Sequence, residues 1–129
     1  MKKNVVRISA DDTLWIVKEI MDLGSVRHIP VVDRGPLVGL VSQRDVLRAS
    51  LSNSSGISAE EQKIFLEGVR IAEVMSAPPR TIGPDEGIQT AARLMAENKI
   101  GCLPVVDGRE IVGILTETDV LRYFALLPA

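Results

Sequence analysis

The sequence predicts a mixed α/β fold of two pseudo-symmetric β-α-β-β-α units packed through their sheets. Three observations support this: an internal repeat, helical and strand-like apolar patterns that recur in each copy, and a length of 129 residues. A chain of this length forms one compact domain or two small interlocked halves. Because one copy of roughly 50 residues buries little apolar surface alone, pairing the two sheets would complete the core.

The repeat consists of two short motifs that recur at one spacing. Ile29-Pro30-Val31-Val32-Asp33 recurs as residues 103–107, and residues 38–48 recur as residues 112–122. Both motifs are displaced by the same number of residues (104 − 30 = 74). Self-similarity at one fixed spacing indicates duplication of a structural unit. We therefore divide the chain into a first repeat at 1–50, a linker with a helix at 51–75 and a second repeat at 76–129.

The first helix of each copy follows an acidic start, at residues 9–12 or 83–86, and carries apolar residues at helical spacing. We expect it to end at Gly24 or Asn98, the residue types that best tolerate the left-handed conformation after a helix. A short strand precedes it, at residues 5–8 in the first copy and 80–82 in the second.

Two β-rich apolar runs follow the first helix in each copy, at residues 29–32 and 37–41 in the first. A turn at 33–36 joins them, and the second copy places Asp107-Gly108, a strong hairpin signal, at the corresponding point. The second helix of each copy then begins at Ser42 or Thr116.

The linker predicts a loop at residues 52–56 and then a helix. Ser58 followed by Glu61 is a capping-box pattern that starts the helix. A lead-in helix at 69–75 then precedes Pro78-Pro79, which forces an extended entry into the second copy. The first copy has no equivalent of this lead-in helix, so either the protein begins abruptly or the chain is cut from a longer one.

Composition excludes several classes of function. The formal charge is −2 and the chain holds one Trp, one Tyr and two Phe, so neither a basic footprint nor a base-stacking platform for nucleic acid is expected. No apolar run approaches the roughly 20 residues of a membrane span. The single cysteine favours a reducing compartment, so we expect a cytoplasmic protein without membrane or nucleic-acid partners.

The common signatures of catalysis and metal binding are missing from the sequence. His28 and Cys102 are each the only residue of their type, so no zinc-site spacing exists. His28 is more often a satisfied, partly buried imidazole, and Cys102 a small buried hydrophobe. We expect no enzyme, no metal and no required cofactor.

A hydroxyl and a carboxylate recur where the last strand of each copy meets its second helix. These are Ser42 and Asp45 in the first copy, and Thr116 and Asp119 in the second. One interpretation is a capping box, in which the acid bonds the amide of the capping residue. The other is a nucleotide site, because a helix start attracts phosphate and a carboxylate can accept both hydroxyls of a ribose. The spacing alone leaves both interpretations open.

Two further features lie close to this junction. Pro30 and Pro104 each stand near a strand start, where a missing donor leaves nearby backbone groups available to read an adenine edge. Positive charge distinguishes the first copy: it carries Arg7, Arg27, His28 and Arg44, where the second carries Thr81, Gly101, Cys102 and Thr118. The arginines are either solvated surface or contacts for phosphate.

The doubled pattern of hxP-V-V-D followed by G-h-h-[ST]-x-x-D-h-L resembles the tandem cystathionine-β-synthase (CBS) domain pair, or Bateman module. The resemblance implies sheet-packed units with clefts that bind adenine nucleotides or adenosyl ligands. It implies that Asp45 and Asp119 bind ribose, that Ser42 and Thr116 contact phosphate or ribose, and that the segments at the first strand and before each proline contact adenine. The predicted ligand contacts are Arg7, Ile8, Arg27, His28, Ile29, Pro30, Ser42, Arg44, Asp45, Thr81, Ile82, Gly101, Cys102, Leu103, Pro104, Thr116, Thr118 and Asp119.

We therefore expect a regulatory module that senses AMP, ADP, ATP or S-adenosylmethionine and signals to an effector domain or partner protein. The rival hypothesis is a structural homodimerisation module in which the repeated acids are only caps. We also expect a homodimer, because the helices carry apolar residues beyond those that one small core absorbs, for instance Leu14, Ile16, Leu47 and Leu121. A third hypothesis, catalysis by Cys102 or His28, finds no base for the thiol and no orienting partner for the imidazole.

Overall fold

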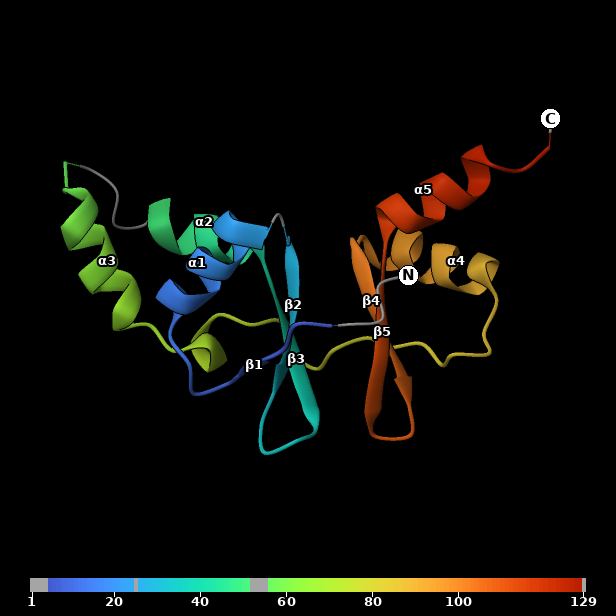
Figure 1. The fold of residues 1–129 in the computed structure, drawn as a ribbon, viewed down its shortest axis with the longest axis horizontal. Coiled ribbons are helices and arrows are strands. Elements are labelled where there is room, and N and C mark those ends of the chain that lie inside the picture. Colours follow the sequence, from blue (N-terminus) through green and yellow to red (C-terminus); the bar gives the residue numbers. More distant parts are fainter. Residues whose placement is uncertain (1–4, 25, 52–55, 129) are drawn as a thin grey trace. The chain divides into compact units, whose positions relative to one another are not determined.

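The computed structural model describes residues 5–24, 26–51 and 56–128, which form two compact units (Figure 1). The N-terminal unit comprises Val6–Pro79, and the C-terminal unit comprises the residues from Arg80 onward together with Val5. Each unit contains one copy of the repeat, and both copies have a mixed α/β structure. The expected fold class is therefore confirmed.

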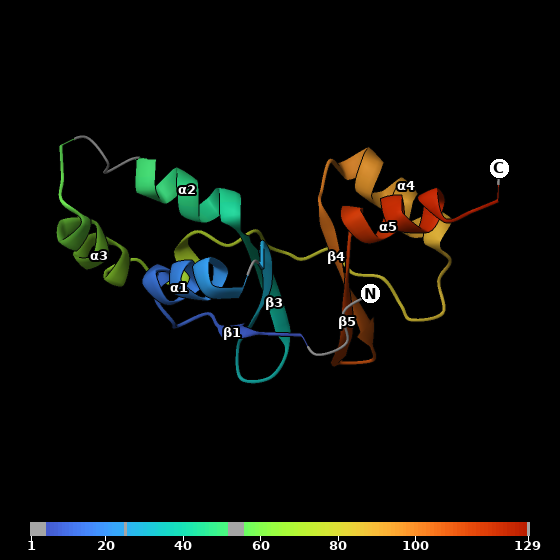
Figure 2. The same ribbon diagram turned by 45° about the horizontal axis from the view of Figure 1, so that its top comes forward.

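In the N-terminal unit, a three-stranded sheet is covered on one face by two helices (Figure 2). The element order is β1 (Ile8–Ser9), α1 (Leu14–Gly24), β2 (His28–Val32), β3 (Leu37–Ser42) and α2 (Gln43–Leu51). Strand β2 lies in the centre, parallel to β1 and antiparallel to β3. The first strand is shorter than expected and lies at 8–9 instead of 5–8, whereas both strands of the hairpin are where the apolar runs predict them.

The linker packs on the N-terminal unit. Helix α3 (Ala59–Glu67) begins with the expected capping box: the Ser58 hydroxyl accepts from the Glu61 amide at 3.1 Å, and the Glu61 carboxylate accepts from the Ser58 amide at 3.3 Å. The expected lead-in helix at 69–75 is wrong, because only a 3₁₀ turn, η1 (Ile71–Glu73), forms there. Of the loop expected at 52–56, residues 52–55 lie outside the described residues.

The C-terminal unit repeats the arrangement with a smaller sheet. Its elements are α4 (Ile88–Asn98), β4 (Cys102–Asp107), β5 (Glu110–Thr116) and α5 (Glu117–Ala125). The two strands pair antiparallel and are joined by a loop at Gly108 and Arg109. The loop begins one residue after Asp107, where the sequence predicts the turn to begin. In place of the strand expected at 80–82, Ile82 alone bridges Val105.

Two expectations about single residues are wrong. The first helix of each copy ends where expected, at Gly24 and Asn98, but Lys99, and not Asn98, adopts the left-handed conformation after α4, with φ 54° and ψ 46°. Asn98 is still helical, and its side-chain amide donates to the Leu94 carbonyl at 2.8 Å. Leu14, expected on the surface, is fully buried, because the linker covers the start of α1. Ile16, Leu47 and Leu121 are exposed as expected, with Leu121 66% exposed.

Each unit has its own apolar core between its strands and helices. In the N-terminal unit the core includes Leu14, Val17, Ile29 and Val41, and the linker adds Leu66 and Ile71, all of them with no exposed surface. The core of the C-terminal unit consists of Ile82, Ala91, Met95, Leu103 and Val105. No helix in the described part of the chain is both long and apolar enough to cross a membrane.

Candidate functional site

The junction of β3 and α2 carries a closed capping box. The Asp45 carboxylate accepts, through Oδ2, from the Ser42 amide at 2.7 Å and from the Ser42 hydroxyl at 3.0 Å. The Ser42 hydroxyl in turn accepts from the Asp45 amide at 3.2 Å. Both side chains are half-buried, and Asp45 Oδ1 has no hydrogen bond to any described residue. Capping therefore occupies one carboxylate oxygen and leaves the other available.

The C-terminal unit builds the same box at the junction of β5 and α5. Asp119 Oδ2 accepts from the Thr116 amide at 2.9 Å and from the Thr116 hydroxyl at 3.1 Å, while the hydroxyl accepts from the Asp119 amide at 3.3 Å. The capping interpretation is thus correct for both copies. It does not exclude the nucleotide interpretation, because a ribose would be bound by the outward side of the same carboxylate.

The start of each second helix offers fewer free amides than its position suggests. The Gln43 amide donates to the Arg27 carbonyl at 2.8 Å, and the Glu117 amide donates to the Gly101 carbonyl at 3.0 Å. The third amide of each helix is taken by the capping hydroxyl. In the first turn, this leaves the amides of Arg44 and Thr118 as the donors for an anion.

These bonds bring several predicted contacts together within each unit. His28 at the start of β2 pairs with Ser42, and Cys102 at the start of β4 pairs with Thr116. The segment before each proline therefore lies beside the hydroxyl and the acid. By contrast, Ile8 pairs with Val31 on the opposite edge of β2. The Ile82 amide donates to the Pro104 carbonyl at 3.1 Å. Arg7–Ile8 and Thr81–Ile82 thus lie apart from the acid of their own unit.

Burial separates the predicted contacts into two groups. Side chains in the first group are buried and can offer a ligand little beyond backbone groups: Ile8, Ile29, Pro30, Ile82, Cys102, Leu103 and Pro104. Side chains in the second group are exposed to solvent: Arg7, Arg27, Arg44, Thr81 and Thr118. His28 and Gly101 are intermediate.

The environment of Cys102 disfavours a nucleophilic role. The side chain is 2% exposed, and burial raises the pKa of its thiol from 9.0 to about 12. Because the thiolate is the reactive species, the protonated thiol at neutral pH is a packing group. Among the described residues, no cluster of three His, Cys, Asp or Glu side chains could hold a metal ion.

One segment beside the first junction was missed by the sequence analysis, which placed it at the end of the linker. Ser76 pairs with Leu40 through two backbone bonds, of 2.8 and 3.0 Å. A Cβ on Gly39 would lie 2.6 Å from the Met75 sulfur and 2.8 Å from the Ser76 carbonyl oxygen, so only glycine permits this approach. Met75 and Ser76 therefore lie against β3 at Gly39 and Leu40, just before Ser42 along the strand. The glycine of the repeated motif was the signal that could have located this segment.

Comparison with known proteins fits this duplicated arrangement. The family model described as "CBS domain" matches residues 1–52 and 71–126, one match on each repeat. The chain belongs to the CBS-domain family. A CBS domain-containing protein of Dictyostelium discoideum is 31% identical over 126 residues, which cover 94% of this chain and 85% of that protein.

Solved structures of CBS pairs have the same fold. The CBS domain pair of protein MJ0100, crystallised in complex with 5′-methylthioadenosine and S-adenosyl-L-methionine, is 27% identical, with a TM-score of 0.79 over 95% of this chain and 93% of that one. A Vibrio cholerae protein named for acetoin utilization (AcuB) is 33% identical, with a TM-score of 0.78, covering 97% and 86%. Two curated relatives from Methanocaldococcus jannaschii are longer, and the chain spans 31% and 45% of their lengths.

Proposed function

We propose that this CBS pair is a regulatory module that binds an adenine nucleotide (AMP, ADP or ATP) or an adenosyl ligand such as S-adenosylmethionine. The observation that carries the proposal is the repeated junction of hydroxyl and acid, in which one oxygen of Asp45 closes the cap while the other has no hydrogen bond to a described residue. A carboxylate fixed by its own helix is preorganised to accept two ribose hydroxyls.

Both repeats support this proposal chemically, because each keeps the hydroxyl and the acid. The backbone bonds from Gln43 to Arg27 and from Glu117 to Gly101 hold the segment before the proline against the helix start. An adenosyl group needs both: polar backbone for its base and a carboxylate for its sugar. The crystallised relative with two adenosyl compounds, 27% identical, has a ligand chemistry that these groups fit.

In this proposal the module carries out no reaction of its own. Binding favours one packing arrangement of the repeats, and an effector domain or partner protein responds to that arrangement. The lone buried thiol is consistent with our placing the module in the cytoplasm.

Calorimetry of the whole chain with AMP, ADP, ATP, S-adenosylmethionine and 5′-methylthioadenosine tests the proposal. A ligand present at 100 times its dissociation constant stabilises the fold by about 2.7 kcal/mol, so thermal melting provides a second readout. We expect at least one of the five to bind and to be recovered unchanged. If none binds or shifts the melting temperature up to about 1 mM, the proposal fails; turnover of the ligand would indicate an enzyme instead.

A second candidate function, homodimerisation without a ligand, is favoured by exposed apolar side chains. Leu47 of α2 is 57% exposed, and on α5 Leu121 and Phe124 are 66% and 73% exposed. Exposed apolar groups gathered on short helices commonly mark protein–protein contacts. Sedimentation tests this point, because a homodimer has twice the 14.0 kDa mass of one chain. A 14.0 kDa species alone at micromolar concentration would count against the homodimer.

A further inference from the structure

The start of α1 is covered by the segment that leads out of α3. The Leu14 amide donates to the Val69 carbonyl at 2.8 Å, and the Ile71 amide donates to the Asp12 carbonyl at 2.9 Å. The Ala72 amide donates to the Ala10 carbonyl at 3.1 Å, and residues 13 and 70 form an antiparallel bridge. Residues 69–72, which run from the end of α3 into the 3₁₀ turn η1, thus pair with the loop before α1.

Two side chains anchor this covering segment. Leu66 and Ile71 have no exposed surface and belong to the core of the N-terminal unit. Burying a branched apolar side chain of this size contributes about 1.5–3 kcal/mol in transfer data. The segment therefore both pairs with the loop and completes the core beneath it.

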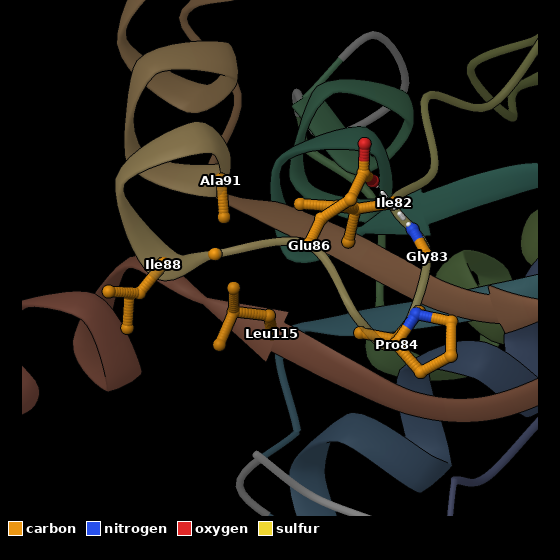
Figure 3. Close-up of a pocket in the computed structure, with 9 residues that line it drawn as sticks. Ile82, Gly83, Pro84, Glu86, Ile88, Ala91 and Leu115 are labelled. Carbon is orange, nitrogen blue, oxygen red and sulfur yellow. Dashed lines mark hydrogen bonds between the residues drawn. The ribbon is translucent and has the colours of Figure 1, made fainter.

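The C-terminal unit has a pocket at the equivalent place (Figure 3). It has a volume of about 170 Å³ and lies at the start of α4. Shifted by the repeat spacing, Leu14 corresponds to Ile88, Val17 to Ala91 and Val41 to Leu115. All three equivalents line the pocket, and Ile88 and Leu115 are partly exposed where Leu14 and Val41 are fully buried.

Backbone groups at the pocket lack the partners that their equivalents have. The three groups paired in the N-terminal unit correspond to the Ile88 amide, the Glu86 carbonyl and the Pro84 carbonyl. None of these three is hydrogen-bonded to another described residue. The Glu86 carboxylate accepts from the Gly83 amide at 2.8 Å, as the Asp12 carboxylate accepts from the Ser9 amide at 3.1 Å. The loops before α1 and α4 therefore have the same internal bond, but among the described residues only the loop before α1 is paired with a second segment.

We propose that this pocket docks an apolar segment of a partner polypeptide, bound as residues 66–72 are bound on the N-terminal unit. The described residues hold two copies of the docking surface, at the starts of α1 and α4, and residues 66–72 cover the first. The occupant places a branched apolar side chain over Ala91 and Leu115. Its backbone donates to the carbonyls of residues 84 and 86 and accepts from the Ile88 amide.

A polypeptide fits this surface better than a small polar ligand does. The lining is apolar apart from Glu86, whose carboxylate is already engaged. The unpaired donor and the two acceptors lie on the turn before α4, at the positions whose equivalents in the N-terminal unit pair with a second backbone segment. Of the residues predicted to contact a nucleotide, only Ile82 lines the pocket, so the inference does not depend on the proposed function.

The test is titration of the isotope-labelled whole chain with a synthetic peptide of residues 63–73, followed by two-dimensional NMR. We expect resonances of Ile82, Ile88 and Ala91 to shift at peptide concentrations up to about 1 mM. A control peptide with aspartate at the positions of Leu66 and Ile71 should bind at least tenfold more weakly. Equal shifts with both peptides, or no shift, would overturn the proposal.

Variants of the protein locate the binding. Ile88→Asp places a charge in the pocket and should abolish the shifts, whereas Gln89→Asp, on the exposed neighbour, should leave them unchanged. Gly87→Leu provides a second block, because a Cβ on this pocket residue meets no atom within 4 Å and the fold accommodates it. Shifts confined to Leu14 and Val17 would show that the peptide replaces the protein's own segment, and would refute the C-terminal site.

Discussion

The two units carry one repeated sequence pattern, yet their cores are closed to different degrees. In the N-terminal unit the first residue of α1, Leu14, has no exposed surface, whereas its equivalent Ile88 is partly exposed. Val41 and Leu115 differ in the same way. The difference arises outside the repeat, because Leu66 and Ile71 of the linker complete only the first core. A repeated motif thus defines the framework of each unit, and the segment packed against it determines how tightly that unit is closed.

The largest expected effect separates the two cores directly. Leu14→Ala should lower the free energy of unfolding by about 2–5 kcal/mol, because it leaves a cavity beneath a covered site. Ile88→Ala, at the equivalent position, should cost less than about 2 kcal/mol, because part of that side chain is already in contact with solvent. Urea unfolding followed by circular dichroism measures both, and Trp15 fluorescence reports on the N-terminal unit. Equal costs would show that the C-terminal core is as closed as the first.

The second prediction compares the two carboxylates. Asp45→Asn and Asp119→Asn keep an oxygen that can cap the helix, so each should lower the free energy of unfolding by at most about 1 kcal/mol. Affinity for the bound nucleotide should fall about tenfold or more, because the charged acceptor of two hydroxyls is lost. Glu117→Gln, an exposed acid in the first turn of α5, is the matched control. A steep fall in melting temperature with unchanged affinity would leave capping as the only role.

Most of the fold could be predicted from sequence because its signals are local. The strand pairs follow contiguous apolar runs, and the boxes at Ser42, Ser58 and Thr116 each require only a hydroxyl and an acid three residues later. The helix cap and the candidate site consist of the same hydroxyl and acid, so one sequence pattern predicted both. That pattern located the junction of strand and helix in each repeat.

What the sequence could not show depends on contacts between distant segments. Leu14 has the same helical pattern whether or not the linker covers it, so its burial by Ile71 was missed. The pairing of Ser76 with Leu40 joins residues 36 positions apart, and no local pattern encodes it. The left-handed residue is Lys99 because α4 continues one residue further than a preference for asparagine at that site suggests.

The third prediction uses the charge difference between the repeats. Arg44→Thr installs the residue that the second repeat has at the equivalent position, and Arg27→Ala removes the neighbouring cation. Both side chains are exposed, so each should weaken ATP and ADP binding about threefold to tenfold and AMP binding less. In the unmutated protein the polyphosphates should show the steeper dependence on salt. Arg48→Ala, one turn further along α2, serves as the control; equal losses for AMP and ATP would make these arginines solvated surface.

The fourth prediction concerns Cys102, which occupies the position that His28 has in the first repeat. Burial raises the pKa of the Cys102 thiol to about 12, so the folded protein keeps a proton that the unfolded chain loses above pH 9.0. The free energy of unfolding should therefore decrease as pH rises above 9, by about 1 kcal/mol at pH 10. Urea unfolding of Cys102→Ala across this range should give a shallower slope than the parent. Parallel slopes would mean that the thiol titrates normally in the folded state.

The smallest expected effect is a stabilisation at the end of α4. Lys99 holds φ 54°, a region that costs a residue with a Cβ about 1 kcal/mol, and its amide donates to the Met95 carbonyl. Lys99→Gly should therefore raise the free energy of unfolding by about 0.5–1 kcal/mol. Lys99→Ala removes the amine and keeps the Cβ, so it should bring no gain. Arg34→Gly tests the same principle in the N-terminal unit, where Arg34 holds φ 56° in the hairpin loop. Gains at both positions would show that backbone conformation limits stability equally in the two units, and that the difference between their cores lies in packing alone.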